Sequence, residues 1–318
     1  MYNSRVSTTE ARLLSYTDSH RIMLIPRLLW LVPALLLTLA LVLLVASEYA
    51  TARASRRTKD VAYVAATAPD FDAARHRLDV YAPRTTSSTL RPVVVFIHGG
   101  SWNSGSKNLY SFVGRRLAKQ GVVAVVINYR LSPGVRVPDM AADCARAVDW
   151  TARHIADYGG DPNRLFTMGH SAGAGLAALL AVKDELFAGL GRSTNPVKGA
   201  ILDDPAGLDM FDYLTKLEYP NDEQYLIPFG KDPAFWRAVS PMYHVRAGNP
   251  PMLLFVGGET YPSITSSSRR FHERLQALGI RHEYTTLPGK KHVGMVTQLY
   301  WKNNVIYQSL LRFVGVKP

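Results

Sequence analysis

Short apolar runs alternate with amphipathic stretches along most of the chain. Runs of about five apolar residues are typical of strands that are buried on both faces of a sheet. They occupy Val93–Ile97, Val122–Ile127, Leu165–Met168 and Met252–Val256, and Val197–Leu202 is expected to be a further strand. Helical patterns lie at Lys107–Gln120, Pro138–Tyr158, Ala174–Val182 and Ser263–Leu278. Strands that alternate with helices predict an α/β fold, with a mainly parallel central sheet and helices on both faces.

Shorter elements complete the predicted domain, which we place at residues 61–318. Val61–Ala65 and Arg77–Tyr81 are expected to be strands before the first buried run, and Arg281–Leu287 is expected to be the last strand. Gly294–Val314 is expected to be a closing helical region. The long stretch between the runs at 197–202 and 252–256 is irregular and rich in aromatic residues. Within it, residues 205–245 are predicted to form a cap or a pocket wall.

The N-terminal part differs in pattern from the rest of the chain. Residues 1–27 form a polar tail, and 28–46 contain no charged residue. As a helix this segment would be about 28 Å long, close to the ~30 Å hydrocarbon core of a bilayer. We therefore expect one transmembrane anchor at 28–46 and a polar linker at 47–60, with the domain on the non-cytoplasmic side. A buried helix and a cleaved signal peptide are the alternatives.

Charge and cysteine content narrow the functional classes. The net charge is +12, but the basic residues are scattered instead of gathered in one nucleic-acid-binding motif. One local run, at Arg53, Arg56, Arg57 and Lys59, follows the apolar segment and suits lipid headgroups or a solvated linker. The single cysteine, Cys144, excludes an internal disulfide and a cysteine-based zinc site, and its apolar surroundings predict buried packing.

Candidate chemistry centres on Gly169-His170-Ser171-Ala172-Gly173, a G-x-S-x-G pentapeptide. It lies between a predicted strand and a predicted helix, which is the context of a nucleophile elbow. The sharp turn leaves no room for side chains beside the serine, so glycine is needed on both flanks. The alternative is an ordinary glycine-rich turn.

Two further motifs follow predicted strands. His98-Gly99-Gly100-Ser101-Trp102 comes after the first buried run, and His292 comes after the last strand. Because the carboxyl ends of parallel strands lie at one edge of the sheet, these motifs should meet Ser171 there. His98 and Trp102 are expected to brace this loop.

At these motifs the sequence resembles the α/β-hydrolase fold and its esterase and lipase branch. The resemblance covers about residues 75–315 and is carried by HGGSW at 98–102, NYRLSP at 128–133, YGGDPNRLFTMGHSAGA at 158–174 and the late His292. The HGG-x-W form is similar to the feruloyl esterase, kynurenine formamidase and prenylcysteine methylesterase relatives. The resemblance implies hydrolysis of an ester or amide and does not name a substrate.

Each expected role has a chemical reason. The hydroxyl of Ser171 needs a base to become a nucleophile, and His292 can take its proton. Backbone N–H groups of Gly99, Gly100 and Ala172 are the expected oxyanion hole, which stabilises the negative oxygen of the tetrahedral intermediate. The alternative for His292 is an ordinary surface histidine, and the alternative for the His98-Gly99-Gly100 motif is a plain turn.

The acid of the triad is less well defined by the sequence. The resemblance implies an acid after the strand at 252–256, but its usual position falls on Thr260. We expect the neighbouring Glu259 to accept the hydrogen bond from His292. Asp203 and Asp204, at the end of the preceding strand, are the other candidates, and a chain that lacks the acid is the third possibility.

Together these features predict a membrane-anchored serine carboxylesterase that forms an acyl-enzyme on Ser171 and needs no metal or organic cofactor. The substrate is expected to be a hydrophobic ester. An arylformamidase-type amide hydrolase or an acyltransferase would use the same residues, and a non-catalytic binding protein with the hydrolase fold is the alternative from another class.

Overall fold

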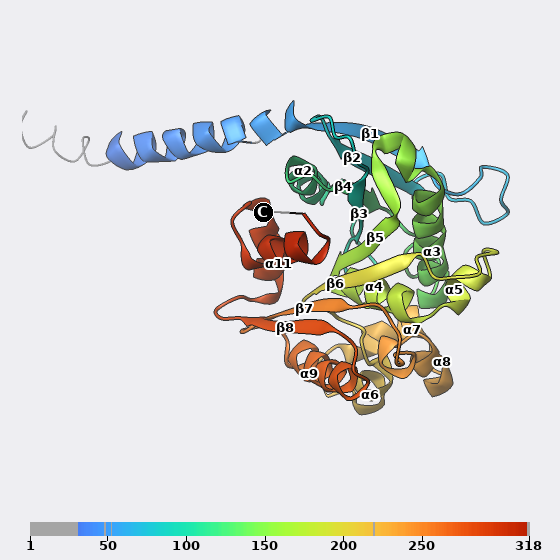
Figure 1. Ribbon diagram of the computed structural model, residues 1–318. Helices are drawn as coiled ribbons and strands as arrows, with labels where there is room; N and C mark the ends of the chain where they lie inside the picture. Colours follow the sequence, from blue (N-terminus) through green and yellow to red (C-terminus); the bar gives the residue numbers. More distant parts are fainter. Residues whose placement is uncertain (1–30, 48, 52, 219, 317–318) are drawn as a thin grey trace, which may run out of the picture. The chain divides into compact units, whose positions relative to one another are not determined.

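The computed structural model describes residues 31–47, 49–51, 53–218 and 220–316, which divide into two compact units, 1–52 and 53–318. The described part of the first unit is the apolar helix Leu31–Thr51 (Figure 1). Its 21 residues are long and apolar enough to cross a membrane, and a signal sequence would have the same properties. The expected tail at 1–27, and residues 28–30 of the expected anchor, lie outside the described residues.

The second unit is built on one sheet with the strand order β1-β2-β4-β3-β5-β6-β7-β8. β1 and β2 pair antiparallel, β2 also pairs antiparallel with β4, and all later neighbours are parallel. The mainly parallel sheet predicted from the apolar runs is therefore confirmed. The strands are β1 Ser55–Ala62, β2 Arg77–Pro83, β3 Arg91–Ile97, β4 Val123–Ile127, β5 Gly160–His170, β6 Val197–Asp203, β7 Met252–Gly257 and β8 His282–Leu287.

The linker expected at 47–60 is wrong, because β1 begins at Ser55 and runs through the basic residues. Arg57 forms an ion pair with the buried Asp79 of β2 at 2.5 Å, and Lys107 pairs with the same carboxylate at 2.9 Å. Burial by itself would raise the pKa of Asp79, but the backbone amide of Asp60 and the two cations hold it below its usual value. The basic residues resembled a solvated linker in sequence, but Arg57 belongs to a strand and pairs with a buried carboxylate.

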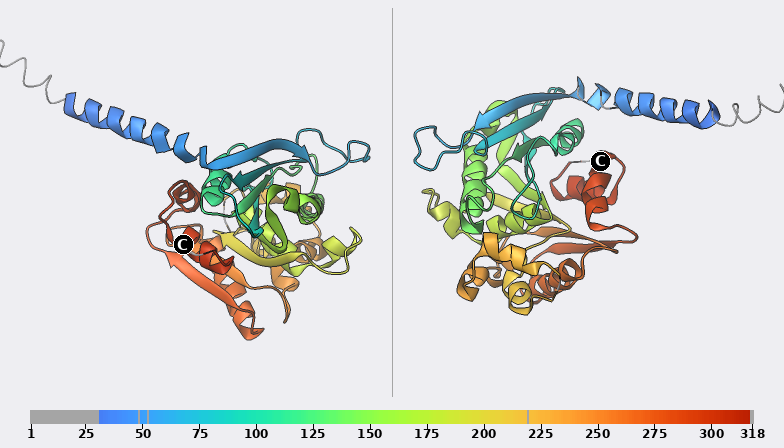
Figure 2. Two further views of the ribbon diagram at one scale, coloured as in Figure 1. Left: turned by 45° about the horizontal axis from the view of Figure 1, so that its top comes forward. Right: turned by 180° about the vertical axis from the view of Figure 1, so that it is seen from behind.

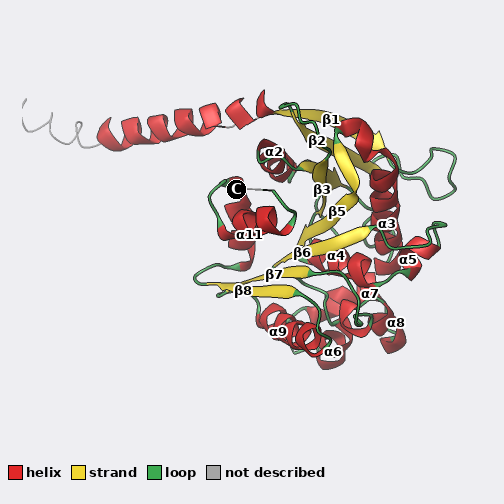
Figure 3. Cartoon of the chain, in the orientation of Figure 1, coloured by secondary structure: helices red, strands yellow, loops and turns green. Residues whose placement is uncertain are grey.

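Helices cover both faces of the sheet (Figures 2 and 3). One face carries α2 and α11, and the opposite face carries α3 and α4. The helices of the unit are α2 Ser111–Lys119, α3 Val137–His154, α4 Ala172–Val182, α5 Glu185–Ala188, α6 Met210–Lys216, α7 Leu226–Phe229, α8 Pro233–Ala238, α9 Pro262–Ala277, α10 His292–Thr297 and α11 Val305–Phe313.

The alternation of side chains along β3 explains the two-layer core. Val93 and Val95 pack into the cluster that contains α3 and α4, whereas Val94 and Phe96 pack into the cluster that contains α2 and α11. A strand that must be apolar on both faces reads as a continuous apolar run, which is why these strands were predictable. Cys144 lies in the first cluster and is buried, as expected.

The segment expected to form a cap, 205–245, contains α6, α7 and α8 and two short 3-10 turns, Asp222–Tyr225 and Pro241–Tyr243. Its helices lie below the sheet in the view of Figure 1, beside α9. The segment folds back on itself, because Met242 near its end donates its backbone N–H to the carbonyl of Leu208 near its start at 3.1 Å.

The strand register aligns the ends of the central strands. Ile97 of β3 pairs with Gly169 of β5, and His170 of β5 pairs with Asp203 of β6. The residues that directly follow these strands, His98, Ser171 and Asp204, therefore emerge at the same edge of the sheet. Chemistry-bearing side chains from distant parts of the sequence are brought together at this edge.

Candidate active site

Ser171 stands at a strained turn between β5 and α4. Its φ is +56° and its ψ is −125°, a conformation that side-chain-bearing residues rarely adopt. The chain is crowded on both sides: a Cβ on Gly169 would lie 2.2 Å from the carbonyl oxygen of Gly173, and one on Gly173 would lie 2.2 Å from that of Ile97. The glycines of the pentapeptide are thus required by close backbone approach, and the predicted elbow is confirmed.

His292, the first residue of α10, joins Ser171 at this edge. Its Nε2 lies 2.8 Å from the Ser171 Oγ, and its Nδ1 lies 2.5 Å from the Asp204 Oδ2. A carboxylate only accepts hydrogen bonds, so Nδ1 carries the proton and Nε2 is left to accept the serine hydroxyl. The hydroxyl, the imidazole and a carboxylate form one continuous chain of hydrogen bonds.

The expectation that Glu259 supplies the carboxylate is wrong. Glu259 is exposed and uses its backbone N–H to bond the carbonyl of Lys290, whereas Asp204 is fully buried against His292. The acid thus comes from the end of β6 and not from the loop after β7. Asp204 was one of the two aspartates held as alternatives.

The loop after β7 orients Asp204. The backbone N–H of Gly257 donates to Asp204 Oδ1 at 2.8 Å, and the hydroxyl of Thr260 donates to Oδ2. Thr260 stands where the resemblance implied an aspartate, and its hydroxyl now contacts the carboxylate that replaces it. The φ of Asp204 is +50°, which turns the side chain out of the β6 direction.

Asp203, the other alternative, serves a different histidine. Its Oδ2 lies 3.2 Å from Nδ1 of His170, and both side chains are buried. Burial raises the pKa of Asp203. The His170 ring lies 4.7 Å from the His292 ring, so this second pair packs directly behind the first.

The three residues expected to form the oxyanion hole surround Ser171. A Cβ on Gly99 would lie 3.1 Å from the Ser171 Cβ, Gly100 has a φ of +124°, and Ala172 is the first residue of α4. In the part of the chain that the structure describes, no backbone carbonyl accepts a hydrogen bond from the backbone N–H of Gly99, Gly100 or Ala172. All three groups remain candidates for binding a negative oxygen near the serine.

His98 braces the loop that holds these glycines, as expected. Its Nδ1 donates to the Gly99 carbonyl at 2.8 Å, and its ring stacks on Tyr129 with a centroid separation of 4.5 Å. The Tyr129 hydroxyl in turn donates to the His98 carbonyl at 2.9 Å. Burial lowers the pKa of His98 to about 4, so the ring is neutral and serves as a fixed support.

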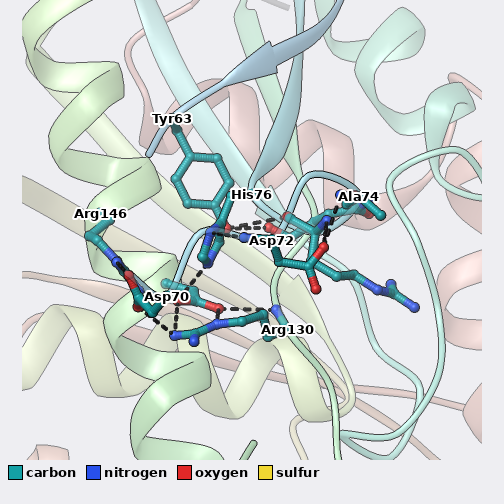
Figure 4. Close-up of polar contacts among 10 residues, drawn as sticks. Tyr63, Asp70, Asp72, Ala74, His76, Arg130 and Arg146 are labelled. Carbon is teal, nitrogen blue, oxygen red and sulfur yellow. Dashed lines mark hydrogen bonds and ion pairs between the residues drawn. The ribbon is translucent and has the colours of Figure 1, made fainter. Parts of the chain in front are cut away.

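A polar cluster around the buried Asp143 anchors the loop that contains Tyr129 (Figure 4). Arg130 donates to both carboxylate oxygens of Asp143 at 2.8 Å, and Arg146 bridges Asp143 and Asp70. His76 lies 3.0 Å from the same Asp143 carboxylate. The cluster ties the segment before β2 to α3, and through Arg130 it fixes the residue next to Tyr129.

A cavity of about 490 Å³ opens beside Ser171 and His292. Trp102 lines it as well as bracing the loop, because its ring packs edge-on against Tyr225 and Phe229 of the cap at 5.8 and 4.8 Å. The cap segment therefore forms a cavity wall, as the sequence indicated.

The structure also brings residues to the cavity that the sequence analysis did not single out. Ser101, Tyr261 and Arg270 line it. Tyr261 follows the loop after β7, and its ring lies 5.1 Å from the His292 ring. Ser101 belongs to the HGGSW motif, so its position could have been inferred, whereas Arg270 lies in a helix with no distinguishing pattern. In the described residues, no cluster of three or more histidine, cysteine or acidic side chains is arranged to hold a metal ion.

Comparisons with known proteins show the family of the chain. The family model named BD-FAE matches residues 78–275. A probable isoprenylcysteine α-carbonyl methylesterase of Arabidopsis thaliana is 30% identical over 245 residues, which cover 71% of this chain and 50% of the relative. The kynurenine formamidase of Salmo salar is 26% identical, over 82% of this chain and 85% of the relative.

Solved structures give the same fold. The apo form of Thermogutta terrifontis esterase 2 superimposes with a TM-score of 0.64 at 26% identity, over 83% of this chain and 97% of that one. The chain spans only about half the length of the plant methylesterases that it matches. Since the family model covers more than half of the chain, the protein belongs to the BD-FAE family and has the α/β-hydrolase esterase fold.

Proposed function

We propose that this protein is a serine carboxylic ester hydrolase in which Ser171, His292 and Asp204 form the catalytic triad. The observation that carries the proposal is the continuous hydrogen-bonded chain from the Ser171 hydroxyl through His292 to Asp204. This arrangement is the one required for activating a serine hydroxyl at neutral pH. The esterase names of the relatives and of the solved structure support the same reaction class.

In the proposed mechanism, Ser171 Oγ attacks the carbonyl carbon of the ester while His292 Nε2 takes the hydroxyl proton. The backbone N–H groups of Gly99, Gly100 and Ala172 are the candidate donors to the negative oxygen that then forms. His292 returns the proton to the departing alcohol, which leaves an acyl group on Ser171. The same histidine then deprotonates water, which attacks and releases the acid.

A non-catalytic binding protein is a poorer interpretation. That alternative rested on a missing or displaced acid, and Asp204 fills the position with hydrogen bonds from Gly257 and Thr260. A protein that had lost catalysis would have no reason to retain the strained backbone at Ser171. An acyltransferase would need an acceptor alcohol to replace water, and a formamidase would cleave an amide with the same residues.

The formamidase alternative has one specific observation in its favour. The salmon kynurenine formamidase is matched along 85% of its length, a larger share than the plant methylesterases offer. Assaying an aryl formamide beside the matching formate ester would compare the two substrates. A higher kcat/KM for the formamide would make amide hydrolysis the better description of the activity.

The decisive test uses a fluorophosphonate probe and a short-chain nitrophenyl ester. We expect the wild-type protein to be labelled covalently and to hydrolyse the ester. Ser171→Ala should lose labelling and about 10⁶-fold in kcat, whereas Ser87→Ala, in an exposed loop, should keep both. A wild-type protein that is neither labelled nor active, or activity that survives Ser171→Ala, would contradict the proposal.

A further inference from the structure

The cavity beside Ser171 has an aromatic wall. Trp102, Tyr213 and Tyr225 all line it and pack edge-to-face in sequence: the Trp102 and Tyr225 rings are 5.8 Å apart, and the Tyr225 and Tyr213 rings are 5.7 Å apart. Tyr261 lines the same cavity next to His292. Four aromatic rings thus surround the space that a substrate must enter to reach the serine.

The same wall has more carboxylates than cations. Four acidic residues and two basic ones line the cavity: Asp209, Asp212, Glu218, Asp222, Lys216 and Arg270. Asp222 is buried, and it accepts a hydrogen bond from the Tyr213 hydroxyl. A carboxylate therefore stands beside the aromatic wall. The cavity is thus not purely hydrophobic.

Both cations of the wall are already engaged. Arg270 forms ion pairs with Asp209 at 3.0 Å and with Asp212 at 2.9 Å, and Lys216 pairs with Asp212 at 3.0 Å. Their positive charges are offset within the wall. Four acidic and two basic side chains give the lining a formal charge of −2, so the cavity favours positive over negative groups.

We propose that the cavity selects esters that carry an alkylammonium group. Aromatic rings attract quaternary ammonium ions through their quadrupoles, and nearby carboxylates add a favourable charge interaction. The substrate ester would place its carbonyl at Ser171 and its cation against Trp102, Tyr213 and Tyr225. This inference rests on the proposed esterase function and names the class of substrate for that site.

Two isosteric esters test the charge directly. Acetylcholine and neohexyl acetate have the same shape, and only the first carries a positive charge. We expect kcat/KM for acetylcholine to be roughly tenfold higher than for neohexyl acetate, which corresponds to one favourable cation–aromatic interaction. The preference should shrink as salt is added, because the carboxylate contribution is screened.

Matched variants locate the preference in the wall. Tyr225→Leu should reduce the ratio of the two kcat/KM values several-fold, whereas Tyr225→Phe keeps the ring and should keep the ratio. Glu218→Gln should lower the ratio by about twofold to threefold. The control is Glu223→Gln: this exposed glutamate is close in sequence but does not line the cavity, so its change should leave the ratio unaltered.

A binding measurement that needs no turnover accompanies the assay. Tetramethylammonium should bind the Ser171→Ala variant by calorimetry, and sodium at the same ionic strength should not compete. A choline-to-neohexyl ratio of one or less, or a preference for the anionic hemisuccinate ester, would overturn the ammonium inference while leaving the esterase proposal intact. Failure to hydrolyse any ester would contradict the esterase proposal, and absent tetramethylammonium binding would contradict the inference itself.

Discussion

Asp204 shows how a single residue can complete a site from a neighbouring strand. Its backbone follows β6 directly, yet its carboxylate bonds the amide of Gly257 at the end of β7. The positive φ of Asp204 makes this reach possible, at a cost in local strain. The hydroxyl of Thr260 donates a hydrogen bond at the position after β7 where the resemblance implied an acid, and the acid itself, Asp204, follows the neighbouring strand β6.

The assignment of the acid can be tested by removing one carboxylate at a time. Asp204→Asn should lower kcat by about 10³-fold to 10⁴-fold, because the amide favours the wrong tautomer of His292. Glu259→Gln should leave kcat within about twofold, since Glu259 is exposed and does not contact His292. Steady-state hydrolysis of a nitrophenyl ester measures both. Equal losses in the two variants would mean that the exposed glutamate also acts on the histidine.

The neutral state of His98 has a consequence for pH stability. Its pKa is about 4 in the fold against 6.5 for an ordinary histidine, so the unfolded chain binds the extra proton first. The contribution of His98 is fully present above pH ~6.5 and is lost as the pH falls towards 4. The free energy of unfolding should therefore drop by roughly 3 kcal/mol over this window.

The matched variant is His98→Asn, whose amide can still donate to the Gly99 carbonyl but does not titrate. Urea midpoints at several pH values would give the difference in unfolding free energy between the two proteins. We expect that difference to move in favour of the variant as the pH falls from about 6.5 to about 4. A difference that stays constant with pH would show that His98 is not held neutral by burial.

At the scale of elements, α4 can approach the end of β3 closely only because Gly173 has no side chain. The turn between β5 and α4 is tight enough for a Cβ on Gly173 to overlap the carbonyl oxygens of both Ile97 and His98. These carbonyls belong to the end of β3 and to the loop of the oxyanion glycines. The G-x-S-x-G motif is thus a packing requirement between three elements as well as a place for the serine.

Gly173→Ala should therefore disturb the site and the fold together. Overpacking of this kind costs about 3 kcal/mol or more, since only backbone can move away. Gly189→Ala is the control, because its Cβ would lie 3.6 Å from the nearest atom and its φ is an ordinary helical −62°. Thermal unfolding monitored by circular dichroism should show a lower midpoint for the first variant only. Equal midpoints would mean that the turn can relax.

The buried strands and the nucleophile turn could be predicted from the sequence for physical reasons. A strand covered on both faces must be apolar at every position, as Val93–Ile97 is, and a turn this tight must use glycine. The strand expected at Val61–Ala65 overlaps only the last two residues of β1, Ser55–Ala62. The start of β1 could not be predicted, because Arg57 is an ion-pair partner of a buried aspartate and resembles a surface residue in sequence. Asp204 could only be held as an alternative, since its reach depends on a backbone angle.

At the scale of the whole molecule, the chain consists of an apolar N-terminal helix and a hydrolase unit that begins at Arg53. We propose that the helix Leu31–Thr51 anchors the protein in a membrane, since a predominantly apolar helix of 21 residues spans about 31 Å. The side of the membrane on which the unit lies is a separate proposal, and we place it outside the cytoplasm.

Removing residues 1–52 tests the independence of the two units. The truncated chain should remain folded and keep its kcat, because the sheet and the active site lie wholly within 53–318. It should also move from the membrane pellet to the soluble fraction after carbonate washing. A full-length protein that is already soluble, with a new N-terminus after residue 46, would indicate a cleaved signal peptide instead of an anchor.

The pairing of His170 with Asp203 across β5 and β6 has one last consequence. The nucleophile and its supporting acid are each the next residue along these two paired strands, so the sheet ladder itself sets their separation. The separation between Ser171 and Asp204 is therefore held by two central strands of the sheet, which open only with large-scale unfolding. We expect this part of the site to keep its geometry on heating until the sheet itself unfolds, so that any earlier loss of turnover would come from the loops that carry His292 and the oxyanion glycines.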